Sequence, residues 1–265
     1  MVFLVLYKNA CSSCLPGSTT NNSLLFSLIG LLVKFELPET HGLSAKTRAN
    51  RALVPEVDNN VALTDIQFEA LENGVARGES VLVCAPTSTG KTLIGWWSIA
   101  SAIERGGRAV YLVSHRALAK QKFEEAQRLF LGSMFAGDRS AIVCATGDSV
   151  EDASGRKTNT PMSASILVAT YEKFLGCMSV GGPPRDLTDT TFVCDEVQLV
   201  GDPNRGQNVE LLLTLMRRAR WKQFVGLSAV MSEPDTDHLA AWLNHPRQCE
   251  IVWRRGRTRG INFVP

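Results

Sequence analysis

The segment from 79 to 104 places a strand, a short turn and a helix in direct succession. ESVLVCAP (79–86) is a continuous apolar run, as expected for a strand that is buried on both faces of a parallel sheet. Apolar residues then recur at helical spacing, at Leu93, Trp96, Trp97, Ala100 and Ile103. A strand that leads straight into a helix is typical of βαβ units, so this segment favours an α/β fold.

The same alternation continues along the chain. Further strands are predicted at 108–114, 141–146, 165–170, 191–195, 223–229 and 249–253, and further helices at 116–130, 207–218 and 236–243. We therefore predict a parallel sheet with helices on both faces, within one domain over residues 56–253. Residues 1–55 are interpreted as an N-terminal extension of unknown role, and residues 254–265 as a basic tail or linker.

The turn APTSTGKT (85–92) has the residue types of a phosphate-binding loop. It matches the pattern G-x-x-x-x-G-K-[ST] at Gly90, Lys91 and Thr92, with Ala85 where the first glycine would stand. In such loops main-chain amides cradle the phosphates, the lysine reaches the β and γ phosphates, and the hydroxyl binds Mg²⁺. We therefore predict a nucleotide site; its loop residues are Thr87, Ser88, Thr89, Gly90, Lys91 and Thr92. An ordinary glycine turn that caps a helix is the alternative.

Two acidic residues follow a later apolar strand. TFVCDE places Asp195 and Glu196 at the end of the strand 191–195. Carboxylates at the end of a buried strand are costly unless they are paired with a cation. We expect Asp195 to hold Mg²⁺ through its water shell and Glu196 to orient the attacking water. An exposed acidic turn without a metal is the alternative.

Further segments resemble the motifs of one family. DEVQLVGD (195–202) resembles motif II of superfamily 2 helicases, in the DExH branch of the archaeal fork-repair helicases and the RNA helicases of exosome cofactors. The resemblance covers most of residues 61–253. The other matching segments are LTDIQFEAL (63–71), SHRALAKQK (114–122), TGD (146–148), TYEKF (170–174), NRGQNVELLL (204–213) and GLSAV (226–230).

The resemblance implies a RecA-like ATP-binding domain that uses ATP and Mg²⁺ to move on or unwind nucleic acid. Gln67 would then bind the adenine edge. One side of a groove for a single-stranded DNA or RNA backbone would be formed by Arg116, Thr146, Gly147, Asp148, Thr170 and Arg205. From the residues alone, Arg116 could instead cap its own helix, and Arg205 could pair with Asp202 or Glu210.

The chain departs from the family pattern in two motifs. Gln198 stands where motif II has histidine; it keeps hydrogen-bonding capacity but loses a titratable ring. It is assigned to the catalytic set with Lys91, Asp195 and Glu196. In motif III, Ser228 and Ala229 are followed by Val230 where the family has threonine. The side chain of valine cannot make the hydrogen bond of a threonine hydroxyl. We therefore expect Val230 to affect the coupling of ATP hydrolysis to strand separation rather than hydrolysis itself.

The family's motor also has a second RecA-like domain, which carries an arginine finger. The sequence ends at Pro265, where that domain would begin, so we expect the second lobe to lie in the same longer chain or to act in trans. Arginines near the end could hold phosphates or form a solvated linker; they are Arg254, Arg255, Arg257 and Arg259.

Composition narrows the remaining alternatives. The net charge of +2 gives no global polyanion-binding field, and the longest apolar run, 24–33, is about half of what a membrane span needs. Seven cysteines without a disulfide framework fit a reducing compartment, so we expect an intracellular, cytoplasmic or nuclear protein without a membrane partner. A P-loop NTPase of another class and a truncated or degenerate nucleotide-binding lobe remain as alternatives.

Overall fold

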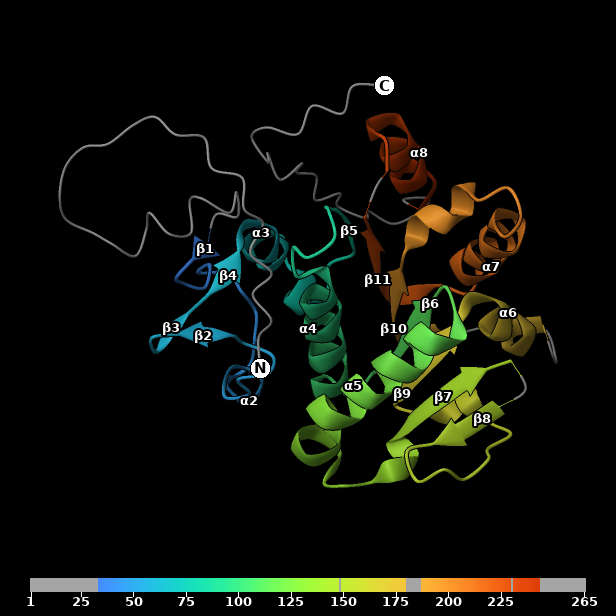
Figure 1. Ribbon diagram of the computed structural model, residues 1–265, viewed down its shortest axis with the longest axis horizontal. Helices are drawn as coiled ribbons and strands as arrows, with labels where there is room; N and C mark the ends of the chain where they lie inside the picture. The colour runs from blue at the N-terminus through green and yellow to red at the C-terminus, as the bar shows by residue number, and fades with distance from the viewer. Residues whose placement is uncertain (1–32, 148, 180–186, 230, 244–265) are drawn as a thin grey trace.

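The structure, a computed structural model, describes residues 33–147, 149–179, 187–229 and 231–243 (Figure 1). Several predictions lie outside these residues. They concern most of the N-terminal extension, Asp148, Val230, the strand 249–253 and the basic tail.

A seven-stranded sheet forms the centre of the domain, in the order β5-β11-β10-β6-β9-β7-β8. Its strands are β5 (Val81–Cys84), β6 (Arg108–Val113), β7 (Ile142–Thr146), β8 (Ser149–Asp152), β9 (Ile166–Thr170), β10 (Leu187–Asp195) and β11 (Trp221–Ser228). Neighbouring strands run parallel except β7 and β8, which are antiparallel. The predicted α/β sheet is confirmed; the antiparallel edge strand β8 was not predicted.

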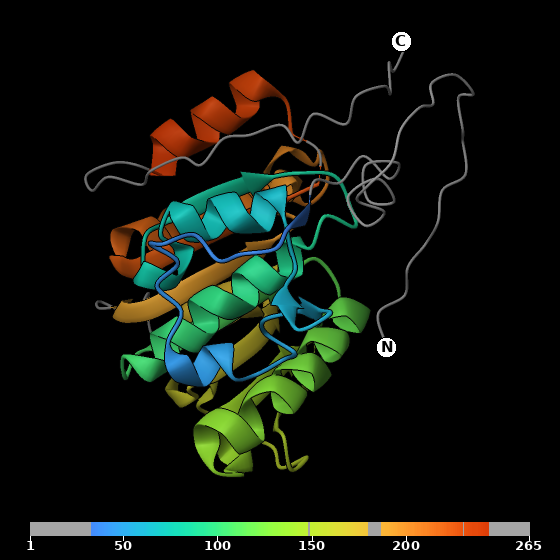
Figure 2. The ribbon, with the colours of Figure 1, turned by 90° about the vertical axis from the view of Figure 1, so that its left-hand side faces the viewer.

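Helices cover both faces of this sheet. An apolar core on one face includes residues of α3 (Asp65–Glu72), α4 (Lys91–Glu104) and α5 (Arg116–Phe135), which lie in front of the strands in Figure 2. A second core on the other face includes residues of α6 (Tyr171–Ser179), α7 (Gly206–Arg218) and α8 (Glu233–Leu243). The central strands are buried from both sides, which explains their unbroken apolar sequences.

Small elements precede the sheet. They are β1 (Val33–Lys34), α2 (Ala45–Arg48), β2 (Glu56–Val57), β3 (Asn60–Val61), β4 (Leu63–Thr64) and the 3₁₀ turn η1 (Val75–Arg77). The later 3₁₀ turns are η2 (Arg139–Ala141), η3 (Pro161–Ser163) and η4 (Val197–Gly201).

Part of the predicted N-terminal extension packs onto α4. Leu53 is fully buried in the core, and its carbonyl accepts a 2.7 Å hydrogen bond from the indole N–H of Trp97. The hydroxyls of Ser44 and Thr47 donate to the carboxylate of Glu104, the last residue of α4, at 2.6 and 2.9 Å. Residues 41–54 therefore belong to the same folded body as the sheet. Within the described chain, no helix is both long and apolar enough to cross a bilayer.

Candidate nucleotide and nucleic-acid site

The parallel sheet brings the predicted motifs to one edge. The loop 85–90 follows β5, Ser114 follows β6, Asp195 ends β10, and Ser228 ends β11. In register, Asp195 pairs with Leu227 of β11, and its neighbour Cys194 pairs with Leu112 of β6. Since the carboxyl ends of parallel strands meet at one edge, residues distant in the sequence become neighbours there.

The phosphate-loop geometry depends on Gly90. It has φ +83° and precedes Lys91, the first residue of α4. A Cβ at Gly90 would overlap the side-chain nitrogen of Gln67, so the close approach of α3 to the loop requires glycine. Ser88 also has positive φ, at +71°. The result is a compact turn at a helix N-terminus, where main-chain amides attract anions.

The ammonium of Lys91 folds over the loop. It donates to the carbonyl oxygens of Ala85 and Pro86 at 2.5 and 2.7 Å. Burial lowers the pKa of Lys91, and the carboxylate of Asp195 opposes that effect. The lysine therefore lies in the electrostatic field of Asp195, although the two residues are far apart in the sequence.

Gln67 joins α3 to the loop. Its Oε1 accepts from the backbone N–H of Thr64 at 3.0 Å, and its Nε2 donates to the carbonyl of Gly90 at 3.1 Å. The Thr64 hydroxyl donates to the carbonyl of Thr89 at 2.9 Å. Each amide atom of Gln67 retains a second hydrogen or lone pair. The role of Gln67 in binding adenine stays a prediction. Its hydrogen bond to Gly90, which holds the loop against α3, was not indicated by the sequence.

Asp195 is largely buried and has two hydrogen-bond donors. The hydroxyl of Tyr111 donates to Oδ2 and the backbone N–H of Glu196 to Oδ1, both at 3.0 Å. Burial raises the pKa of Asp195, while Tyr111 and then Lys122 lower it. The carboxylate of Asp195 and the hydroxyl of Thr92 are oxygen donors of the kind that Mg²⁺ prefers, so their role as Mg²⁺ ligands stays a prediction.

Four predicted nucleic-acid residues converge on one pocket of about 480 Å³ at the same sheet edge, beyond the ends of β6, β7 and β9: Arg116, Gly147, Thr170 and Arg205. Other residues that line it are Ser114, His115, Glu172 and Lys173. Thr146 is half-buried and is absent from this lining, and Asp148 lies outside the described residues. The pocket combines several cations with main-chain and hydroxyl groups, as expected for backbone recognition.

Hydrogen bonds inside this pocket hold two of its cationic side chains, Lys173 and Arg205, in place. Lys173, which the sequence did not indicate, donates to the carbonyl of Gly147 at 2.8 Å. Arg205 binds the carboxylate of Glu172 through Nε at 2.9 Å and through a terminal nitrogen at 2.5 Å. Its ion-pair partner is therefore neither Asp202 nor Glu210, although Asp202 accepts from its backbone N–H at 2.8 Å.

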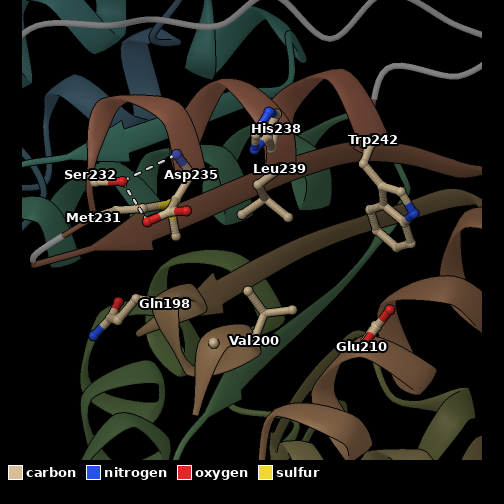
Figure 3. Close-up of a pocket in the computed structure, with 10 residues that line it drawn as sticks. Gln198, Val200, Glu210, Met231, Ser232, Asp235, His238, Leu239 and Trp242 are labelled. Atoms are coloured by element: carbon tan, nitrogen blue, oxygen red, sulfur yellow. Dashed lines mark hydrogen bonds between the residues drawn. The ribbon is translucent and has the colours of Figure 1, made fainter. Parts of the chain in front are cut away.

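Of the residues predicted to connect motif II to motif III, Ser228 lies next to the phosphate loop, where its carbonyl accepts from the backbone N–H of Ala85 at 3.1 Å, and Gln198 lines a second pocket. Gln198 belongs to η4 and lines a pocket of about 600 Å³ opposite α8, together with Val200, Leu239 and Trp242 (Figure 3). Within the described chain, Gln198 Oε1 and the Ser228 hydroxyl are buried without a hydrogen-bond partner. Ala229 is half-buried. No hydrogen bond joins these motif II and motif III residues in the described chain, so their coupling role stays a prediction.

The fold and the phosphate loop define a P-loop nucleotide-binding domain of the α/β class. A family model described as DEAD/DEAH box helicase matches residues 64–239. The chain therefore belongs to the DEAD/DEAH box helicase family, which confirms the resemblance.

Similar proteins agree with this assignment. The chain is 38% identical over 181 residues to the ATP-dependent DNA helicase Hel308 of Pyrococcus abyssi, covering 67% of this chain and 23% of that protein. It is 36% identical to Hel308 of Pyrococcus horikoshii, covering 73% of this chain and 25% of that protein. The chain thus spans about a quarter of the length of these relatives.

A solved structure shares the fold. The Mycobacterium smegmatis helicase Lhr bound to ssDNA and AMP-PNP matches with a TM-score of 0.59 and 24% identity, over 80% of this chain and 28% of that one. At this identity the likeness supports the RecA-like architecture alone.

Proposed function

We propose that this chain is the ATP-binding lobe of a nucleic-acid-dependent ATPase or helicase. One observation carries the proposal: a phosphate loop and an acidic pair meet at the sheet edge beside a pocket lined by cations. A P-loop enzyme that acts on a small molecule has no need for the second feature. Membership in a helicase family supports the same conclusion.

In this proposal the loop 87–92 binds the phosphates of ATP, and Lys91 leaves its carbonyl partners to contact the β and γ phosphates. Thr92 and Asp195 hold Mg²⁺, which supplies charge neutralisation at the phosphates when bound. Glu196 orients the attacking water. Gln67 binds adenine, and Gln198 connects the hydrolysis site to motif III.

The pocket lined by Arg116, Thr170 and Arg205 binds the backbone of single-stranded DNA or RNA. Arg116, Thr170 and Arg205 contact phosphates and sugars, together with Lys173 and the main chain at Gly147. The second RecA-like lobe lies in the same longer chain or acts in trans. We place the protein inside the cell, in the cytoplasm or the nucleus.

Binding of labelled ATP tests the nucleotide half of the proposal. Lys91→Ala removes the cation that faces the phosphates, so we expect ATP affinity to fall about tenfold or more. An unchanged dissociation constant, measured by fluorescence anisotropy, would sink the site assignment.

Binding of a labelled single strand tests the other half, with DNA and RNA oligonucleotides of matched sequence. We expect the double variant Arg116→Ala with Lys173→Ala to weaken binding about tenfold or more, and to reduce its dependence on salt. Arg128→Ala is the matched control, because Arg128 is an exposed cation of the same helix α5. Equal losses of affinity in the double variant and in Arg128→Ala, or no binding of a single strand by wild type, would contradict the proposed interface. Either result would favour a P-loop NTPase of another class or a lobe without unwinding activity.

A further inference from the structure

Lys122 of α5 is an unusual residue to bury. It is 5% exposed, although a buried ammonium is costly unless it finds partners. Its Nζ donates to the hydroxyl of Thr92 at 3.3 Å and to Glu125 at 3.1 Å, and lies 5.9 Å from the ring centroid of Tyr111. One of these partners, Thr92, is a proposed Mg²⁺ ligand.

Tyr111 makes the equivalent contact to the other proposed ligand. It is fully buried in β6, and its ring packs against Trp96 with centroids 4.8 Å apart. Its hydroxyl donates to Oδ2 of Asp195 at 3.0 Å.

We propose that Lys122 and Tyr111 are positioning residues that hold the Thr92 hydroxyl and the Asp195 carboxylate in place for Mg²⁺. The inference rests on the proposed function, since it concerns the same nucleotide site. The two proposed ligands come from different elements, Thr92 from α4 and Asp195 from the end of β10. Lys122 contacts Tyr111 and Thr92, and Tyr111 contacts Asp195 and also interacts with Thr92, so the pair joins the two halves of the site.

The hydrogen bonds leave the ligands free to bind. Tyr111 uses one lone pair of Oδ2, and the N–H of Glu196 uses one of Oδ1, so each oxygen keeps a further lone pair. The Thr92 hydroxyl likewise accepts from Lys122 with one of two lone pairs. The contacts thus fix orientation before binding, which lowers the entropic cost of ordering the site around the metal.

The chain contains a matched pair of tyrosines for a test. Tyr171 is as buried as Tyr111, but its hydroxyl donates to the main-chain carbonyl of Asp195, at 2.8 Å, rather than to the carboxylate. Tyr111→Phe and Tyr171→Phe each delete one buried hydroxyl next to the same residue. Only the first change frees the carboxylate, so the second controls for a general loss of packing or stability.

The measurement is the dissociation constant of a fluorescent ATP analogue, in excess EDTA and across a Mg²⁺ titration. We expect Tyr111→Phe to weaken the Mg²⁺-dependent gain in affinity about tenfold, as for a lost hydrogen bond to a charged group, with unchanged affinity in EDTA. Tyr171→Phe should keep the full Mg²⁺ dependence. Lys122→Met should behave like Tyr111→Phe, and Lys122→Arg should restore part of the gain.

The outcomes separate this inference from the function on which it rests. Wild-type protein that binds no ATP, or binds it without any Mg²⁺ dependence, overturns both. Wild-type protein with a Mg²⁺ dependence that Tyr111→Phe retains in full overturns only the positioning role. Equal losses in EDTA and in Mg²⁺, or equal effects of the two tyrosine changes, also overturn it, because they indicate a purely structural contribution.

Discussion

Gly90 combines two constraints in one residue. Its φ of +83° is strained for any residue with a side chain, and the space where a Cβ would stand is filled by the amide of Gln67. Gly106 has a similar φ, +76°, but nothing lies within 4 Å of its Cβ position. The two glycines therefore allow backbone strain and side-chain overlap to be separated.

We predict that Gly106→Ala lowers the free energy of unfolding by about 1 kcal/mol and leaves ATP binding unchanged, because it introduces strain alone. Gly90→Ala should lower stability by more than this, and should weaken ATP binding about tenfold, because Gln67 must leave the loop. Urea unfolding and an ATP titration on both variants check this. Similar affinities in the two variants would contradict the role of the Gln67 contact.

Some residues of the site could be predicted from the sequence and others could not. Lys91, Thr92 and Asp195 lie in short motifs whose spacing is visible in the sequence. Tyr111 and Lys122 stand in an apolar strand and in a helix, and nothing local indicates that they reach the motifs. Their contacts depend on the sheet order, which places β6 beside β10. Such residues can be found only once the topology is known.

At the scale of elements, adjacent strands are tied at their N-terminal ends by an ion pair. Arg108 of β6 donates two hydrogen bonds, both 2.9 Å, to the carboxylate of Asp189 in β10. The hydrogen bond from Arg108 is the largest cause that lowers the pKa of Asp189 from its ordinary 3.8. The resulting stabilisation is therefore present above pH 3.8 and lost as the pH falls through the lower, folded-state pKa.

Asp189→Asn should accordingly lower the melting temperature at pH 7, by about 2 °C for a partly exposed pair worth about 1 kcal/mol at most. The difference from wild type should shrink as the pH falls below 3.8 and through the lower, folded-state pKa of Asp189, because the carboxylate takes up a proton. Thermal unfolding across this pH range measures it. Glu124→Gln, at an exposed carboxyl of α5, is the control. A difference that persists at low pH would refute the ion-pair explanation.

Elements differ in how well the sequence predicts them. The buried parallel strands and the helices α4, α5, α7 and α8 were predicted because their apolar patterns are local, whereas the helices α3 and α6 were not predicted. The strand β8 was missed: its sequence SVED is short and mixed in polarity, and it pairs only as an antiparallel edge. The pairing of Arg205 with Glu172 was missed for a similar reason, since it joins α6 to the start of α7 across sequence distance.

At the scale of the whole molecule, the chain spans about a quarter of its relatives' length. In the function proposed above a second lobe supplies the arginine finger, so we predict that the 265-residue chain alone binds ATP but hydrolyses it about 10³- to 10⁵-fold more slowly than a protein with both lobes. Steady-state phosphate release, with and without an added second lobe, checks this. Turnover of about 10 per second by the chain alone would contradict it.

The packing of residues 41–54 on α4 has a consequence for where the folded domain can be cut. The family match begins at residue 64, yet Leu53 and Trp97 are hydrogen-bonded in one core. A protein that began at residue 64 would lack Leu53, so the indole N–H of Trp97 would lose its hydrogen-bond partner and part of the apolar core would be exposed. The segment that the family model matches and the segment that packs into one folded body therefore begin at different residues of this chain.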